Sequence, residues 1–70
     1  MTPAPPCLTP REKECIELAA AGLSSAETAQ RLKVADRTVE FHLRNAMRKL
    51  GASSKLRAVV LALQKRLIEL

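Results

Sequence analysis

The residues best suited to chemistry in this sequence fall between positions 36 and 50, where arginines recur at helical spacing around a single phenylalanine. When successive residues are placed about 100° apart around a helix axis, one side gathers Arg37, Phe41, Arg44 and Arg48, with Asn45 near its edge. Glu40 lies between that side and an opposite, apolar stripe. Guanidinium groups bind phosphates, and Arg, Asn and Glu can form hydrogen bonds with base edges. The pattern indicates a surface for a polyanion; this segment alone also fits a solvated charged face with one stray phenylalanine.

The distribution of charge indicates which part of the chain would bind a polyanion. The 70-residue chain has 12 Lys and Arg against 7 Asp and Glu, which gives a net charge of +5. Residues 1–30 contain two basic and four acidic residues, whereas residues 31–70 contain ten basic and three acidic ones. Because an excess of positive charge attracts polyanions, we expect such a partner to bind the second half of the chain.

Few other residues could support catalysis or hold a metal. The single histidine, His42, has no nucleophile pattern beside it, and the sequence contains no glycine-rich phosphate loop. A structural zinc site needs four ligands, whereas the chain offers one histidine and two cysteines without CxxC spacing. We favour a core position for Cys15 and a tail position for Cys7 over a short disulfide between them. We therefore expect no enzymatic activity, no metal and no cofactor.

The first residues, MTPAPPC, contain three of the four prolines and lack the apolar segment of a signal peptide. No stretch approaches the run of about 18 apolar residues that a membrane helix needs. We interpret residues 1–7 as a flexible tail or linker remnant and residues 8–70 as one domain, and we expect a cytoplasmic protein with no membrane partner.

The segment 36–50 needs neighbours that cover its apolar side, and the rest of the sequence predicts three further helices. Apolar residues recur at spacings of three and four, and no part of the chain alternates as a strand does. Thr9 and Ser24 each precede a glutamate by three residues, as in a capping box, and Gly22 and Gly51 suit left-handed helix ends. We predict an all-α four-helix bundle, with helices at about 9–21, 25–32, 36–50 and 54–68.

The second and third predicted helices form a functional unit. A short helix, a tight connection and a longer basic helix are typical of a helix-turn-helix, whose second helix enters the major groove of DNA. The groove walls are phosphates, which favour arginine and lysine, and an apolar side chain such as Phe41 can contact a thymine methyl group. The sequence therefore predicts that helix 36–50 binds DNA.

Several short segments carry a resemblance to a known family: Leu8-Thr9-Pro10-Arg11-Glu12, Gly22-Leu23-Ser24, Thr38-Val39-Glu40-Phe41-His42 and Arg48-Lys49-Leu50. Their order and spacing are similar to those of LuxR-type helix-turn-helix domains, and residues 38–50 resemble the quorum-sensing branch in particular. The likeness covers nearly the whole chain, from Leu8 to about Ile68. It implies sequence-specific binding of double-stranded DNA by a bacterial transcriptional regulator, either as an excised effector domain or as a small stand-alone protein.

The resemblance also implies roles for individual residues, carried over by position. Base contacts are expected from Glu40, Phe41 and Arg44. Phosphate contacts are expected from Ser24, Ser25, Arg37, Thr38, Arg48 and Lys49. For His42, a structural role and a phosphate contact both stay open.

Two positions depart from the family pattern. Ala35 stands where Ser or Thr is common, so the third helix loses an N-cap unless Asp36 replaces it one residue later. Thr28 stands where a larger aliphatic residue is usual, which predicts a looser contact between the second and third helices.

The predicted fourth helix has one side suited to the core, formed by Ala58, Val59, Ala62 and Leu63. The side expected to face outward contains Arg57, Val60, Leu61 and Gln64, with Ile68 nearby. The resemblance implies a homodimer through this helix, weak in free solution, that binds a palindromic operator. The alternative is a helix-turn-helix module that docks on another regulator or on RNA polymerase. A basic membrane-binding peptide is disfavoured, because capped and separated helices describe a folded domain.

Overall fold

The computed structural model describes residues 7–69, and within them the chain forms four α-helices and no strand. The helices are α1 (Pro10–Ala20), α2 (Ser25–Leu32), α3 (Asp36–Leu50) and α4 (Lys55–Gln64). The prediction of an all-α helix-turn-helix fold is therefore confirmed. The tail predicted at residues 1–7 lies outside the described residues except for Cys7.

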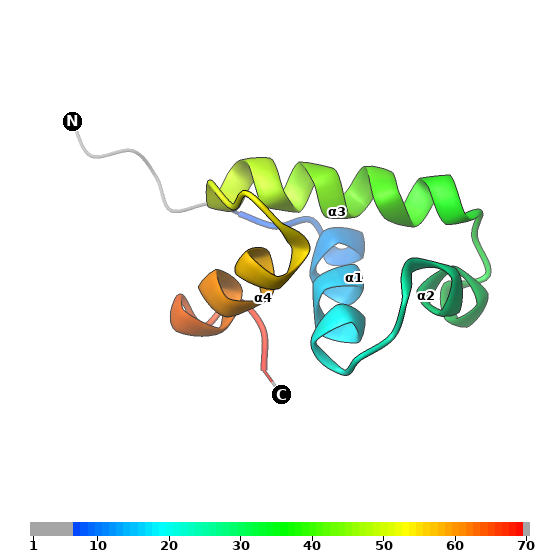
Figure 1. The fold of residues 1–70 in the computed structure, drawn as a ribbon, viewed down its shortest axis with the longest axis horizontal. Coiled ribbons are helices and arrows are strands. Elements are labelled where there is room, and N and C mark those ends of the chain that lie inside the picture. The colour runs from blue at the N-terminus through cyan, green and yellow to red at the C-terminus, as the bar shows by residue number, and fades with distance from the viewer. Residues whose placement is uncertain (1–6, 70) are drawn as a thin grey trace.

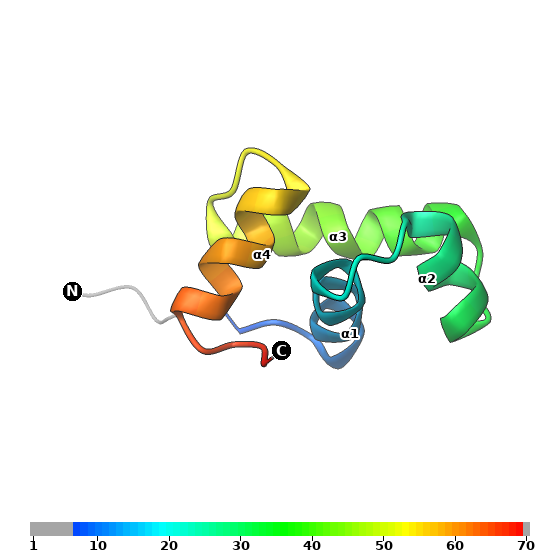
Figure 2. The ribbon, with the colours of Figure 1, turned by 60° about the horizontal axis from the view of Figure 1, so that its bottom comes forward.

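The long helix α3 organises the domain (Figure 1). It runs along the long axis of the domain, with α1 against its middle and α2 and α4 toward its two ends, and a second view shows the same arrangement (Figure 2). One side of α3 therefore packs on the other helices, and its opposite side remains free.

Helices α1, α2 and α4 begin where a side chain accepts a hydrogen bond from one of their first backbone N–H groups. In α1 the Thr9 hydroxyl accepts a hydrogen bond from the Glu12 backbone N–H at 3.1 Å, and the Glu12 carboxylate accepts one from the Thr9 N–H at 2.9 Å. Ser24 and Glu27 form the same reciprocal pair at the start of α2. Both capping boxes are as predicted, because each depends only on residues three positions apart.

A left-handed residue follows each of the four helices. Gly22 and Gly51 have φ values of 95° and 66°, as expected for glycines just beyond α1 and α3. After α2, however, a lysine adopts this conformation: Lys33 has a φ of 60°. Its neighbour Val34 donates a backbone hydrogen bond to Ala29 at 3.0 Å, which closes the last turn and makes the connection to α3 tight.

Small and aliphatic side chains make up the core. Its fully buried members, at most 1% exposed, are Cys15, Ile16, Ala29, Val39, Ala46, Ala58 and Ala62. Four of these seven are alanines, so the helix axes can approach closely without aromatic side chains between them. Thr28 is also buried, at 2% exposure.

The end of α4 corrects the prediction of a helix reaching residue 68. The helix ends at Gln64, because Arg66 adopts a left-handed φ of 56° and Leu67 donates a backbone hydrogen bond to Ala62 at 2.8 Å. The chain then turns back, and Ile68 is 3% exposed within the core. The expectation that Ile68 lies near the outward face of this helix was therefore wrong. Leu61 is half-buried against the core as well.

Candidate nucleic-acid interface

The free side of α3 carries the residues that the sequence places there. Arg37, Glu40, Arg44 and Arg48 are exposed, and the Phe41 side chain is 57% exposed. The apolar stripe of the same helix is buried in the core, with Val39 and Ala46 fully covered. The helical spacing of residues 36–50 therefore separates a packing side from a second side that meets solvent.

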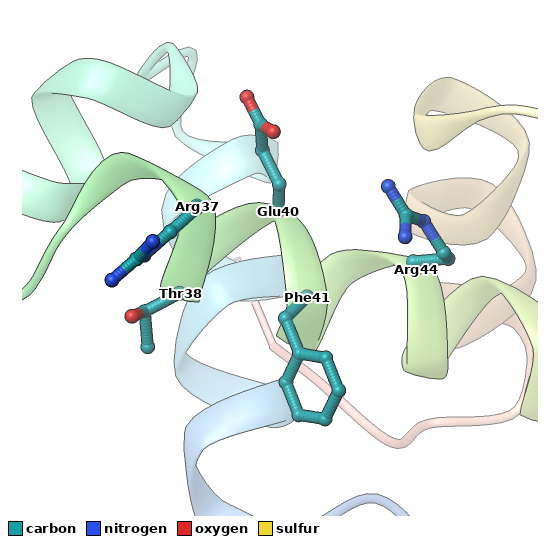
Figure 3. A pocket seen from close by; sticks show the side chains of 5 residues that line it. All are labelled: Arg37, Thr38, Glu40, Phe41 and Arg44. Carbon is teal, nitrogen blue, oxygen red and sulfur yellow. The ribbon is translucent and has the colours of Figure 1, made fainter.

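Five residues of this free side line an open hollow of about 380 Å³, which we call the α3 face: Arg37, Thr38, Glu40, Phe41 and Arg44. In the close-up, Glu40 and Arg44 project to one side of the helix, and the Phe41 ring projects to the other (Figure 3). The base-contact candidates Glu40, Phe41 and Arg44 therefore line one hollow although they project to different sides of it. The phosphate-contact candidates Arg37 and Thr38 lie toward the start of the same helix.

The guanidinium groups of the α3 face are free to bind another molecule. The ion pairs found among residues 7–69 are Arg11–Glu14 and Lys49–Glu12, so Arg37 and Arg44 take part in none. Arg48 differs, because its Nη2 donates a hydrogen bond to Asn45 Oδ1 at 3.0 Å. That bond orients the Arg48 side chain along the helix without neutralising its charge.

The exposed Phe41 has one aromatic neighbour. The Phe41 and His42 rings meet edge to face, with centroids 5.6 Å apart and an interplanar angle of 65°. His42 is half-buried, so it lies at the boundary between the α3 face and the packed side of the helix. The His42 ring therefore lies against the exposed ring of the α3 face.

Lys49 is placed differently from the other phosphate-contact candidates. Its Nζ lies 2.7 Å from Glu12 Oε1 and donates a second hydrogen bond to the Cys7 carbonyl oxygen at 3.2 Å. Glu12 is only 3% exposed. Burial alone would raise the pKa of Glu12, but hydrogen bonds from Lys49 and Thr9 outweigh burial and hold this pKa below its ordinary value.

The partner of Lys49 was missed in the sequence. Glu12 was identified only as a member of a capping box, and its pairing with Lys49 joins residues 37 positions apart. No local spacing rule connects residues so distant in sequence, so the pairing requires the packing of α1 against α3.

The two serines at the start of α2 have different surroundings. Ser24 is exposed, and its hydroxyl oxygen accepts the hydrogen bond from the Glu27 N–H at 3.1 Å, which leaves its own hydroxyl hydrogen free to donate. Ser25 is half-buried. Ser24 is therefore the more accessible of the two candidates for a phosphate oxygen.

A second exposed surface lies on α4. Its apolar members are Leu56, with 73% of the residue exposed, and Val60, with 42% exposed. Arg57 and Gln64 are exposed beside them, whereas Leu61 turns toward the core. Leu56 was missed in the sequence, although its spacing of four residues from Val60 places both on one side of a helix.

Comparison with known proteins identifies the family of this domain. A model of the family described as bacterial regulatory proteins, luxR family, matches residues 6–62. The chain belongs to the LuxR family. It is a helix-turn-helix DNA-binding domain of the type found in transcriptional regulators.

Individual members of the LuxR family agree with this assignment. The chain is 49% identical over 55 residues to the transcriptional activator protein AnoR of Acinetobacter nosocomialis, covering 79% of this chain and 23% of AnoR. It is 46% identical over 63 residues to RpaR of Rhodopseudomonas palustris, a quorum sensing-dependent transcriptional regulator, covering 90% of this chain and 26% of RpaR. The chain thus spans about a quarter of the length of these relatives.

A solved structure shows the same LuxR-family fold. The transcription factor GerE superposes with a TM-score of 0.84 at 31% identity, over 89% of this chain and 92% of GerE. None of the helices in the described part of the chain is long and apolar enough to cross a membrane.

Proposed function

We propose that this domain binds double-stranded DNA at specific sequences, as the effector domain of a bacterial transcriptional regulator acting in the cytoplasm. The observation that carries the proposal is the α3 face, where a 57%-exposed phenylalanine stands among arginines that form no ion pair within residues 7–69. The B-DNA major groove, about 12 Å wide, admits one α-helix. Insertion of α3 would bring Arg37 and Arg44 to phosphates or bases while covering the Phe41 ring.

Base contacts and phosphate contacts are divided over the α3 face and its surroundings. We assign Glu40, Phe41 and Arg44 to the bases. The Glu40 carboxylate can accept a hydrogen bond from a cytosine amino group, the Phe41 ring can contact a thymine methyl group, and the Arg44 guanidinium can bind guanine. We assign phosphate contacts to Ser24, Ser25, Arg37, Thr38 and Arg48. Lys49 is left out of this set because its ammonium group is already paired with Glu12.

The α4 surface supports a further proposal, that two copies bind DNA together. Leu56 and Val60 form an apolar patch that a second copy would cover, with Arg57 and Gln64 at its edge. Leu61 contributes less than the sequence predicted because it packs inward. So small a patch supports only a weak dimer in free solution. Two-fold symmetry would separate the α3 helices by about 34 Å, one turn of DNA, and would match a palindromic operator.

The experiment begins with selection of bound duplexes from a random pool, followed by titration of the selected duplex and a scrambled duplex. Replacing Arg44 with alanine should weaken binding to the selected duplex by about 1–3 kcal/mol and binding to the scrambled one much less, because base contacts carry the specificity. Lys13→Ala, an exposed basic position on α1, is the matched control and should change neither affinity. Equal losses on both duplexes would remove Arg44 from the base contacts, and failure to select any duplex would refute the proposed function.

A protein-docking module is the second candidate, and the exposed Leu56 and Val60 favour it. In that case the α4 surface would bind another regulator or RNA polymerase, and the domain would scarcely bind DNA alone. A mobility-shift assay at two salt concentrations separates the candidates, since a DNA-binding domain shifts duplex more strongly at low salt. A palindrome and a single half-site in the same assay report whether two copies bind together.

A further inference from the structure

One ammonium group joins three separate segments of this domain. Lys49 lies in the last turn of α3, and its Nζ is 2.7 Å from Glu12 Oε1 in the first turn of α1. The same Nζ is 3.2 Å from the carbonyl oxygen of Cys7, in the incoming segment that precedes α1. We call this set of contacts, formed by Cys7, Glu12 and Lys49, the Lys49 clamp.

The charged form of the buried Glu12 carboxylate in the clamp is stabilised by the Lys49 ammonium group. The Glu12 side chain is 4% exposed, so water cannot solvate its charge, and Oε1 also accepts the hydrogen bond from the Thr9 N–H at 2.9 Å. A buried carboxylate that loses its partner cation is strongly destabilised. The Lys49 side chain is 36% exposed, so solvent reaches it, but moving its ammonium group away from Glu12 would leave the Glu12 charge without a cation.

Arg48, next to Lys49 in the sequence, has different contacts from Lys49. Arg48 is exposed, and the only hydrogen bond that its side chain forms among the described residues is to the uncharged Asn45 side chain. Arg48 can therefore bind a phosphate without breaking an ion pair, whereas Lys49 cannot.

We propose that Lys49 is a positioning residue that holds the C-terminal end of α3 against α1 and the incoming segment, and that it does not bind a DNA phosphate. This inference rests on the proposed function, because its consequence is a fixed placement of the α3 face when DNA binds. It replaces the phosphate contact that the resemblance implies for Lys49. It also makes the clamp the link between the chain preceding α1 and the DNA-binding helix.

A double-mutant cycle on DNA affinity tests the inference, with the 70-residue chain and the selected duplex titrated at several salt concentrations. If Lys49 acts through Glu12, then Lys49→Met weakens binding in the wild-type background and has little further effect in the Glu12→Gln background. The salt slopes of Glu12→Gln and of the double variant should then be equal. Loss of a phosphate contact by Lys49 would instead lower the slope by about 0.9 in either background.

Arg48→Met is the matched control, since it removes the adjacent cation and is expected to lower the slope. Additive losses of affinity, together with a lower slope for the double variant, would overturn the inference. If Lys49→Met does not fold, the comparison of Glu12→Gln with the double variant still decides, because in the double variant neither position carries a charge.

Thermal unfolding of the same four proteins without DNA keeps the two proposals distinguishable. If the effects of the Glu12 and Lys49 substitutions on the melting temperature are not additive, but no duplex binds, the clamp contacts are supported and the proposed function is refuted. Coupled melting temperatures with additive DNA affinities would confirm the ion pair but overturn its role in positioning α3 for DNA.

Discussion

A serine at position 35 should stabilise the domain, because α3 is the one helix within residues 7–69 that begins without a side-chain cap. Thr9, Ser24 and Ser54 each accept a hydrogen bond from the backbone of the helix they precede, whereas Ala35 provides none. Asp36, which the sequence suggested as a substitute, is already the first residue of the helix. The perturbation is Ala35→Ser, which introduces one hydroxyl acceptor.

The structure indicates that the new hydroxyl needs no rearrangement. Ala35 has φ −73° and ψ 151°, close to the φ −72° and ψ 168° of the working cap Ser24. Ala35 is also exposed, so the larger side chain meets no neighbour in the core. A side-chain N-cap contributes about 1 kcal/mol, and in a domain of this size that free energy raises the melting temperature by roughly 4–8 °C.

The assay is thermal and urea unfolding followed by circular dichroism, with the denaturant slope m as a check that the compactness of the unfolded state is unchanged. Ala35→Thr and Ala35→Val form a matched pair, since they have nearly the same shape and only threonine carries the hydroxyl. The threonine variant should melt above the valine variant. If the serine, threonine and valine variants all have the melting temperature of the wild type, the missing cap at the start of α3 does not reduce the stability of the domain, and the reasoning is refuted.

Two further predictions concern backbone strain and pH. Lys33→Gly should raise the free energy of unfolding by about 0.5–1 kcal/mol, because glycine adopts the φ of 60° without the strain of a lysine; unchanged urea unfolding would contradict this. The melting temperature should also fall as the pH drops below 4.5, the ordinary pKa of Glu12. The folded-state pKa of Glu12 is lowered, so its stabilising effect is complete above that value and is lost on protonation. Thermal melts across this range should show a smaller fall for Glu12→Gln, and an equal fall in both proteins would refute the assignment.

Several features of the fold could be predicted because they depend on residues close together in the sequence. These are the starts of the helices, two of the helix ends and the packing side of α3. The capping boxes at Thr9 and Ser24 are recognisable from a spacing of three residues, and their hydrogen bonds formed as expected. Gly22 and Gly51 could be placed for a similar reason, since few other residues adopt a left-handed conformation easily. The packing side of α3 followed from helical periodicity, and Val39 and Leu43 are buried as that pattern requires.

The end of α4 could not be predicted, because its cause is not local. Apolar residues continue through Leu67 and Ile68 without a glycine or proline, so the pattern favours a longer helix. In the folded domain Arg66 accepts a left-handed backbone, and Ile68 turns back into the core at 3% exposure. Burial of an isoleucine side chain contributes about 1.5–3 kcal/mol, which is enough to offset the strain at Arg66.

The candidate site also contains residues whose placement has a local cause and residues whose placement depends on contacts between helices. The exposure of Arg37, Phe41 and Arg44 follows from the phase of one helix, so the sequence alone could place them on one surface. Helical spacing within α4 was less informative about which side chains are exposed. The sequence analysis did not identify Leu56 as exposed, and it placed Leu61 on the outward side although Leu61 packs against the core. The role of Lys49 depends on a carboxylate from another helix, and spacing within α3 carries no information about that contact.

The composition of the core makes the position of Phe41 more informative than exposure alone. A single exposed apolar side chain is ordinary on a protein surface, and in a domain with several aromatic residues one of them could be exposed by chance. Here the packed interior uses alanine, valine, isoleucine, leucine and cysteine, so the chain's one phenylalanine has no structural role in the core. Its ring lines the same hollow as Arg37 and Arg44, which form no ion pair in the described part of the chain although Glu40 lines the hollow as well. Folding explains neither the exposed ring nor the unpaired charges, whereas insertion of α3 into a DNA groove explains both.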